Sequence, residues 1–159
     1  MPRDLRGFEP IYHQDVIDSL PSLLSNQYED QMGCLVAVVD DDISVRESLE
    51  SLIRSVGIQV KVFASAEEFL SAAHNGSADC LVLDVRLPGM SGVELHHHLL
   101  GHNCKLPAIF ITAHASDDCA RREARSDWTV AYLTKPFDEA ELLDAVHAAL
   151  KWKPDIETN

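Results

Sequence analysis

The sequence has no apolar run close to the roughly 18–20 residues that cross a bilayer, so no membrane-spanning helix is expected. Its first residues, MPRDLRGFEPIYHQD, contain no apolar segment like that of a signal peptide, so secretion is not indicated. The 4 cysteines include no C-x-x-C pair, which argues against a zinc knuckle or a dithiol redox site. Cys80 lies in an apolar run and is expected in the core. These absences favour a reduced, cytoplasmic protein.

Basic residues are also scarce, with 13 Lys and Arg against 26 Asp and Glu and a formal net charge of −13. Such a surface repels phosphate groups, so we expect no direct binding to DNA, RNA or anionic membranes. The apolar fraction of 46% is ordinary for a globular protein, and 159 residues allow one domain with an appendage.

Residues 1–33 differ from the rest because they are polar and lack strand-like runs. Residues 16–24 have helical apolar spacing, but Pro21 disfavours a long unbroken helix there. We expect a short surface helix or a loose tail, and the alternative is a docking or dimerising segment. The expected organisation is an N-terminal extension (1–33), a domain (34–152) and a C-terminal tail (153–159).

From residue 34 onward, short apolar runs alternate with amphipathic stretches. Most of the runs are nearly continuous, as in parallel strands covered on both faces, whereas the second alternates more and is expected nearer an edge. Strand–helix alternation of this kind predicts an α/β fold with a doubly wound parallel sheet. The runs cover residues 35–40, 58–63, 80–84, 108–112 and 130–134.

Helix starts are marked by Ser or Asp followed three positions later by Glu, which is the spacing of a capping box. Gly57 is expected to end the first helix, and the Pro88-Gly89 turn is expected to place its glycine at positive φ. Gly92 would permit a close backbone approach. The capping pairs are Ser65–Glu68, Ser91–Glu94 and Asp138–Glu141.

Ligands of open parallel sheets bind beyond the carboxyl ends of the strands, and polar residues follow several of the predicted strands. Asp40 and Asp41 follow the first, Asp84 ends the third, Thr112 ends the fourth and Lys135 follows the fifth. Clustered carboxylates repel one another unless a cation joins them, and oxygen ligands of this kind suit Mg²⁺. A central carboxylate with an ammonium and a hydroxyl nearby predicts a phosphoryl-transfer site with Asp84 as the nucleophile.

Four segments carry a family resemblance: VAVVDDDISVRESL, CLVLDVRLPGMSGVEL, FITAH and AYLTKPFDEAEL. Over roughly residues 34–151 the chain resembles the receiver domain of two-component response regulators, a CheY-like superfamily, and is most similar to FixJ-like receivers. The resemblance implies a flavodoxin-like (βα)5 fold with strand order 2-1-3-4-5. FixJ-like receivers usually precede a helix-turn-helix output domain.

For the acceptor site, the resemblance implies that Asp84 accepts the phosphoryl group and that Lys135 binds it. Mg²⁺ would be held by Asp40, Asp41, Asp84 and the backbone carbonyl of Arg86. The donor would be a sensor histidine kinase or a phosphotransfer protein. The protein would not be an enzyme beyond catalysing its own phosphorylation and dephosphorylation.

For the output, the resemblance implies that Thr112 is a switch hydroxyl and Tyr132 an aromatic switch. Phosphorylation would repack the face formed by the fourth helix, fifth strand and fifth helix, which would bind an unknown downstream protein or a second copy. The Lys135-Pro136 bond resembles one that is cis in the family. Asp42 is expected to be a helix N-cap.

Alternatives stay open at this point. The chain ends at Asn159 and, with its N-terminal segment, is expected to be a natural single-domain regulator; the alternative is the isolated receiver of a helix-turn-helix transcription factor. An aspartyl-nucleophile phosphatase-like hydrolase would need an acid two residues after Asp84, where Arg86 stands. A flavin carrier lacks its Ser/Thr/Gly-rich phosphate loop after the first strand.

Some residues invite other interpretations. The run His96-His97-His98 is expected to face water mostly, and the His98–His102 pair is weak evidence for a metal. Arg86 and His114 could control access of hydrolytic water.

The stretch 116–128 is a poor amphipathic helix, and Trp128-Thr129 stands where receivers usually carry Gly-Ala. The fourth helix is therefore expected to end differently, with Trp128 exposed. Its small core candidates are Cys119, Ala120 and Ala124, and its arginines Arg121, Arg122 and Arg125 are expected to form a solvated face or the rim of a partner site.

Overall fold

The computed structural model describes residues 33–72, 78–114, 116 and 118–152. The helical spacing predicted within residues 16–24 and the predicted tail 153–159 lie outside the described residues. Within the described ranges, no helix is both long and apolar enough to cross a membrane.

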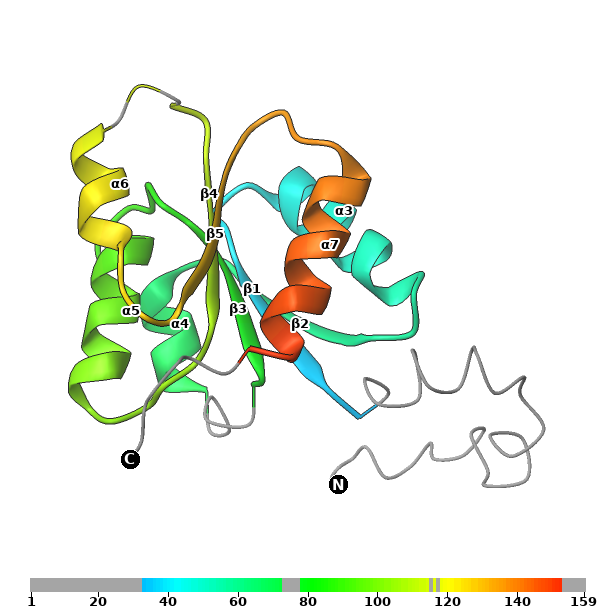
Figure 1. The fold of residues 1–159 in the computed structure, drawn as a ribbon, viewed down its shortest axis with the longest axis horizontal. Coiled ribbons are helices and arrows are strands. Elements are labelled where there is room, and N and C mark those ends of the chain that lie inside the picture. The colour runs from blue at the N-terminus through cyan, green and yellow to red at the C-terminus, as the bar shows by residue number, and fades with distance from the viewer. Residues whose placement is uncertain (1–32, 73–77, 115, 117, 153–159) are drawn as a thin grey trace. The chain divides into compact units, whose positions relative to one another are not determined.

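Five parallel strands form one sheet in the order β2-β1-β3-β4-β5, which confirms the predicted fold (Figure 1). Each strand lies within a residue or so of its predicted range. The second run is at an edge, as predicted, and the fifth forms the other edge. The strands are β1 (Leu35–Val39), β2 (Gln59–Phe63), β3 (Cys80–Asp84), β4 (Ala108–Thr112) and β5 (Thr129–Thr134).

Helices cover both faces of the sheet, with α3 and α7 on one side and α4, α5 and α6 on the other (Figure 1). Several begin at the predicted caps: the Asp42 carboxylate accepts from Ser44 N, and Ser91 and Glu94 form a complete capping box. Gly57 follows the first helix at φ +87°, as expected. The helices are α3 (Ile43–Arg54), α4 (Ala66–Ser71), α5 (Gly92–Gly101), α6 (Asp118–Ala124) and α7 (Glu139–Leu150).

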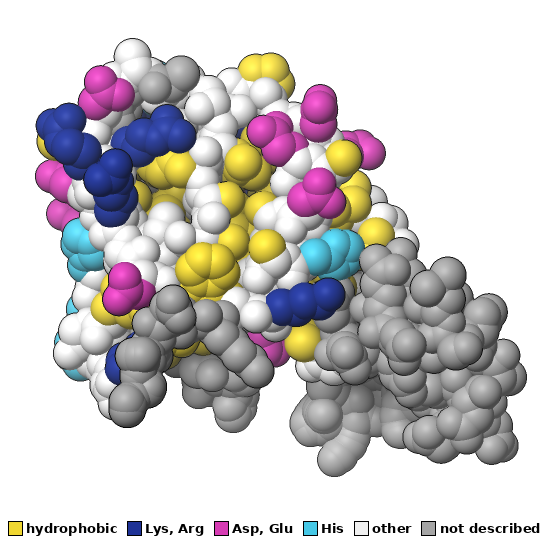
Figure 2. All heavy atoms as spheres, viewed as in Figure 1, with side chains coloured by type: hydrophobic (Ala, Val, Ile, Leu, Met, Phe, Trp, Pro, Cys, Tyr) yellow, Lys and Arg dark blue, Asp and Glu magenta, His cyan; other side chains and the backbone are white. Residues whose placement is uncertain are grey.

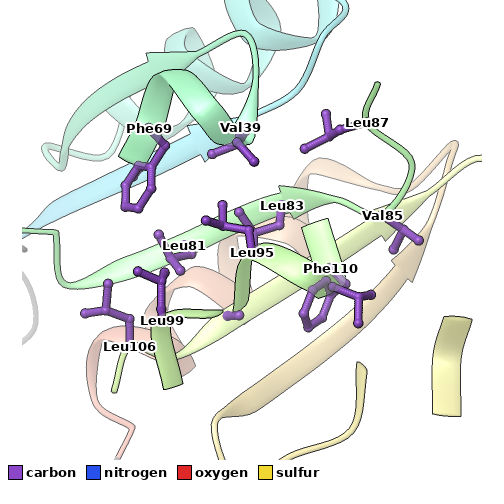
Figure 3. Close-up of a cluster of buried hydrophobic side chains, with 14 of the residues drawn as sticks. Val39, Phe69, Leu81, Leu83, Val85, Leu87, Leu95, Leu99, Leu106 and Phe110 are labelled. Carbon is purple, nitrogen blue, oxygen red and sulfur yellow. The ribbon is translucent and has the colours of Figure 1, made fainter. Parts of the chain in front are cut away.

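The alternation of side chains along the central strands divides the core into two layers. Leu81 and Leu83 of β3 point toward α4 and α5, where they pack with Phe69, Leu95 and Phe110 (Figure 3). Cys80 and Val82 point the other way, toward α3 and α7. Because β3 is buried on both faces, the position of the Asp84 that ends it is determined by the whole sheet.

Two predictions from side-chain patterns are wrong. His96 does not face water: it is fully buried, its Nε2 lies 2.9 Å from the Leu106 carbonyl oxygen, and its ring packs edge-on against Phe110. Cys119 of α6 is exposed rather than in the core. His97 and His98 are exposed as expected.

Candidate functional site

The strand register brings the predicted site residues to one edge of the sheet. Val39 lies opposite Leu83, so the next residues, Asp40 and Asp84, are neighbours beyond the carboxyl ends of β1 and β3. On the other side of β3, Asp84 lies opposite Ile111, the residue before Thr112. Thr112 in turn lies opposite Thr134, and Lys135 follows it. We call Asp40, Asp41, Asp84, Thr112 and Lys135 the acidic site.

The three aspartates converge. One carboxylate oxygen from each of Asp40, Asp41 and Asp84 lies within 4.8 Å of the others, and this is the only such group of three or more potential metal ligands among the described residues. Asp40 is fully buried and Asp84 is 7% exposed, while Asp41 is exposed. The cluster therefore has two desolvated carboxylates at its base and one toward solvent.

Burial and charge crowding shift the pKa of the central carboxyl. Burial, and next the negative charge of Asp40, raises the pKa of Asp84 to about 6. The backbone hydrogen bond from Arg86 N and the ammonium of Lys135 oppose this shift without cancelling it. A divalent cation among the three carboxylates would relieve the repulsion, so the donor set fits Mg²⁺.

Lys135 supplies positive charge to both buried carboxylates. Its Nζ lies 3.3 Å from Asp40 Oδ2 and 3.6 Å from Asp84 Oδ2. The backbone places it there, because Lys135 N donates to the Thr112 carbonyl at 2.7 Å. The Lys135-Pro136 bond is cis, as the resemblance implies. The ammonium can therefore contact an anionic group bound to Asp84.

The loop after β3 is folded tightly around Asp84. Arg86 N donates to Asp84 Oδ1 at 3.0 Å, and Gly92 N donates to the Val85 carbonyl at 3.2 Å. A Cβ at Gly92 would overlap the backbone carbonyl of Asp84, so the close approach expected at this glycine is confirmed. Gly89 has φ +76°, also as expected.

Thr112 is fully buried, and its Oγ1 accepts from the backbone N of His114 at 3.0 Å. The side chains of His114 and Arg86, the two candidate controls on water access, are exposed. Tyr132 does not join the acidic site. It lies opposite Phe110 within the sheet, two positions before the end of β5, and packs against the core layer that includes α5 and α6.

Two supporting residues were not predicted from the sequence. Glu67 of α4 accepts from Met90 N at 2.9 Å, which ties α4 to the loop after β3. Arg46 Nη1 donates to the Asp40 carbonyl at 2.8 Å. The capping-box spacing predicts a role for Glu68, and no local pattern distinguishes Glu67 because its partner is 23 positions away.

A second set of contacts joins the end of α6 to the start of β5; we call Arg121, Ala124, Asp127, Thr129, Tyr132 and Trp152 the α6–β5 corner. The Thr129 hydroxyl donates to the Ala124 carbonyl and lies 3.1 Å from Ser126 Oγ. Hydroxyl groups therefore bind the end of α6 in this chain, which has Trp128-Thr129 where receivers usually carry Gly-Ala. Trp152 Nε1 donates to the Asp127 carbonyl at 2.9 Å. Trp128 is half-buried rather than exposed.

Comparison with known proteins agrees with this architecture. Residues 36–147 match the family model described as the response regulator receiver domain. The chain belongs to the receiver family of two-component response regulators. Receivers of this family generally bind Mg²⁺ in an acidic pocket and are partnered by sensor histidine kinases.

Individual relatives show the extent of the match. The chain is 37% identical over 139 residues to the response regulator protein TmoT of Ectopseudomonas mendocina, covering 87% of this chain and 63% of that protein. It is 49% identical over 115 residues to nodulation protein W of Bradyrhizobium diazoefficiens, covering 72% and 50%. The crystal structure of FixJ-N superposes with a TM-score of 0.69 at 34% identity, over 77% of this chain and 98% of that one. The chain thus spans between 50% and 63% of the length of these two curated relatives.

Proposed function

We propose that this chain is a phosphorylation-controlled receiver in which Asp84 accepts a phosphoryl group from a histidine kinase or a phosphotransfer protein. The observation that carries the proposal is the pairing of the buried Asp84 carboxylate with a Lys135 ammonium 3.6 Å away and two further aspartates within 4.8 Å. An Asp84 oxygen attacks phosphorus as the bond to the donor imidazole breaks, giving an aspartyl phosphate and a neutral histidine.

Asp40, Asp41, Asp84 and the backbone carbonyl of Arg86 would hold Mg²⁺. When bound, the ion neutralises oxygen charge during transfer. The chain's own residues orient the nucleophile: the Arg86 amide holds Asp84 Oδ1, and Lys135 lies beside Asp84 Oδ2. One oxygen of the carboxylate is thus restrained by the backbone, and the other faces the ammonium.

Thr112 and Lys135 would then bind the new phosphoryl oxygens, the inward orientation that Tyr132 has in this structure would be stabilised, and the face formed by α6, β5 and α7 would repack. This protein would act by binding others, and its only catalysis would be its own phosphorylation and dephosphorylation. A cytoplasmic location follows from the donor, because histidine kinases phosphorylate their regulators in the cytoplasm.

The face of α6, β5 and α7 has an uneven distribution of charge. Lys and Arg side chains gather over α6, and Asp and Glu side chains gather over the start of α7, with apolar side chains between them (Figure 2). Two copies related by a two-fold axis would place the basic side of one against the acidic side of the other. We infer that a second copy is one partner of this face after phosphorylation.

A helix-turn-helix regulator is the second candidate context. Relatives of which this chain covers about half include the transcriptional regulatory protein FixJ of Azorhizobium caulinodans, of which it covers 54%. In that context the same switch would control a DNA-binding domain, and the net charge of −13 makes direct contact between this chain and DNA unfavourable.

The test is phosphorylation by acetyl phosphate, followed by intact-protein mass spectrometry. We expect one added phosphate in the presence of Mg²⁺, loss of that addition after chelation, and none for Asp84→Asn. Asp42→Asn is the matched control, because asparagine caps the helix as well as aspartate does and Asp42 contributes a cap rather than a ligand. Unchanged mass of the wild type, or equal labelling of the Asp84→Asn variant, would overturn the proposal.

A further inference from the structure

Arg121 covers the ring of Tyr132. The guanidinium carbon of Arg121, on α6, lies 4.7 Å from the ring centroid of Tyr132 on β5. This is inside the roughly 6 Å limit for an attractive cation–π contact. The centroid of the Tyr132 ring also lies 6.3 Å from the ring centroid of Phe110, which is fully buried. Tyr132 is therefore bordered by a core aromatic residue and by a surface cation.

The orientation of Tyr132 is inward. Its hydroxyl oxygen is buried, and its side chain packs against the core layer formed by β3, β4 and α5. The guanidinium of Arg121 thus interacts with a ring that already has the inward orientation. A cation in this place stabilises the inward orientation, because an outward movement of the ring would lose the contact.

The contact is restrained at the other end of α6 as well. Ala124, one turn after Arg121, accepts a hydrogen bond through its carbonyl from the hydroxyl of Thr129, which lies on the same strand as Tyr132. Asp127, between them, accepts from the Trp152 indole at 2.9 Å. The short helix α6 is therefore joined to β5 at Ala124 as well as at Arg121, and the residues between them are joined to Trp152, which follows α7.

We propose that Arg121 is a positioning residue for the switch: by stabilising the inward orientation of Tyr132, it raises the population of the conformation that accepts phosphorylation. The inference rests on the proposed function, in which inward Tyr132 accompanies phosphorylation of Asp84. Since a ligand of the activated state binds more tightly when that state is already populated, loss of Arg121 weakens ligand binding at Asp84 without any change at the site itself.

The experiment measures the affinity for beryllofluoride, a phosphoryl mimic, with Mg²⁺ in excess and at protein concentrations where all variants are monomeric by sedimentation velocity. We expect Arg121→Ala to weaken binding about 2–5-fold, the size of an exposed cation–π contact. Arg121→Lys should recover part of the loss. Arg122→Ala is the matched control because it removes the same charge from the same exposed helix without a described contact to the ring.

A double-mutant cycle separates positioning from a general effect of charge. The loss caused by Arg121→Ala should persist in a Tyr132→Phe background, which keeps the ring, and disappear in a Tyr132→Leu background, which removes it. Equal losses in Arg121→Ala and Arg122→Ala, or an unchanged Arg121→Ala effect in the Tyr132→Leu background, would overturn the inference and leave the proposed function intact. No beryllofluoride binding by the wild type would instead overturn the proposed function.

Discussion

The acidic site and the α6–β5 corner are assembled in different ways. In the acidic site, main-chain groups do most of the positioning: Arg86 N contacts Asp84, Asp42 N contacts Asp40 at 2.9 Å, and Lys135 N contacts the carbonyl of Thr112. In the α6–β5 corner, the side chains of Arg121, Thr129 and Trp152 make the links.

This difference matters for what a substitution can change. Main-chain contacts depend on strand register and on the room left by small residues such as Gly92, so side-chain changes that do not fill this room leave the acidic site in place. Side-chain contacts can be altered one residue at a time. The corner is therefore where this chain can differ from its relatives while the chemistry of the acidic site is preserved.

The largest expected effect comes from closing the space beside Asp84. Gly92→Ala should lower the free energy of unfolding by about 3 kcal/mol, because the added Cβ would overlap the backbone carbonyl of Asp84. Gly101→Ala, at the other end of α5, has nothing within 4 Å of its added Cβ and should be neutral or stabilising by about 0.5 kcal/mol. Urea denaturation monitored by circular dichroism measures both.

Equal stability changes in these two variants would contradict a site held by close backbone packing. The sheet would be unaffected, but the tight turn around Asp84 would no longer explain the position of the carboxylate.

An intermediate effect on stability is expected from a change of pH. It acts through the buried His96, which packs against Phe110, a neighbour of Tyr132 in the α6–β5 corner. Burial lowers the pKa of His96 below its ordinary value of 6.5, so the unfolded chain takes up a proton that the folded chain rejects. The stabilisation is complete above pH 6.5 and is lost as pH falls, by up to about 1.4 kcal/mol per pH unit until the folded pKa is reached.

The measurement is the free energy of unfolding between about pH 7.5 and about pH 5.0, a range that includes the ordinary histidine pKa of about 6.5. The difference between wild type and His96→Phe should depend on pH and move against the wild type as pH falls, because only the wild type carries the histidine that takes up a proton on unfolding. A constant difference for His96→Phe would mean that burial does not lower the pKa of His96 in the folded protein.

The smallest effect is expected at the corner. Trp152→Phe keeps an aromatic ring but removes the indole N–H that donates to the Asp127 carbonyl, and should cost about 1 kcal/mol. Trp128→Phe makes the same chemical change at a half-buried indole that has no described hydrogen bond, and should cost less. Thermal unfolding of the two variants compares them, and a larger loss for Trp128→Phe would count against the link from α7 to the corner.

Most of the acidic site could be predicted from the sequence because the information is local. The residues after apolar runs must meet at one sheet edge once the runs are parallel strands, so Asp40, Asp84, Thr112 and Lys135 follow from strand order. Gly89 and Gly92 were predictable for the same reason, since turn geometry is encoded by neighbouring residues.

The rest depended on partners distant in sequence. Glu67 and Trp152 contact backbone groups 23 and 25 positions away, and nothing in the residues beside them marks those contacts. The prediction for His96 is wrong because His96 begins a run of three histidines of which the other two are exposed, and only the packing of α5 against β4 shows that its position faces Phe110. The prediction for Cys119 is wrong because α6 has only 7 residues, which are too few for apolar spacing to show which of its faces is buried.

The most direct test of the account is to locate the phosphoryl group chemically. Protein treated with acetyl phosphate and Mg²⁺ is reduced with borohydride, which converts an aspartyl phosphate to homoserine, and the digested peptides are sequenced by mass spectrometry. We expect conversion at Asp84 alone. Conversion at Asp40 or Asp41, or no conversion in correctly folded protein, would contradict it.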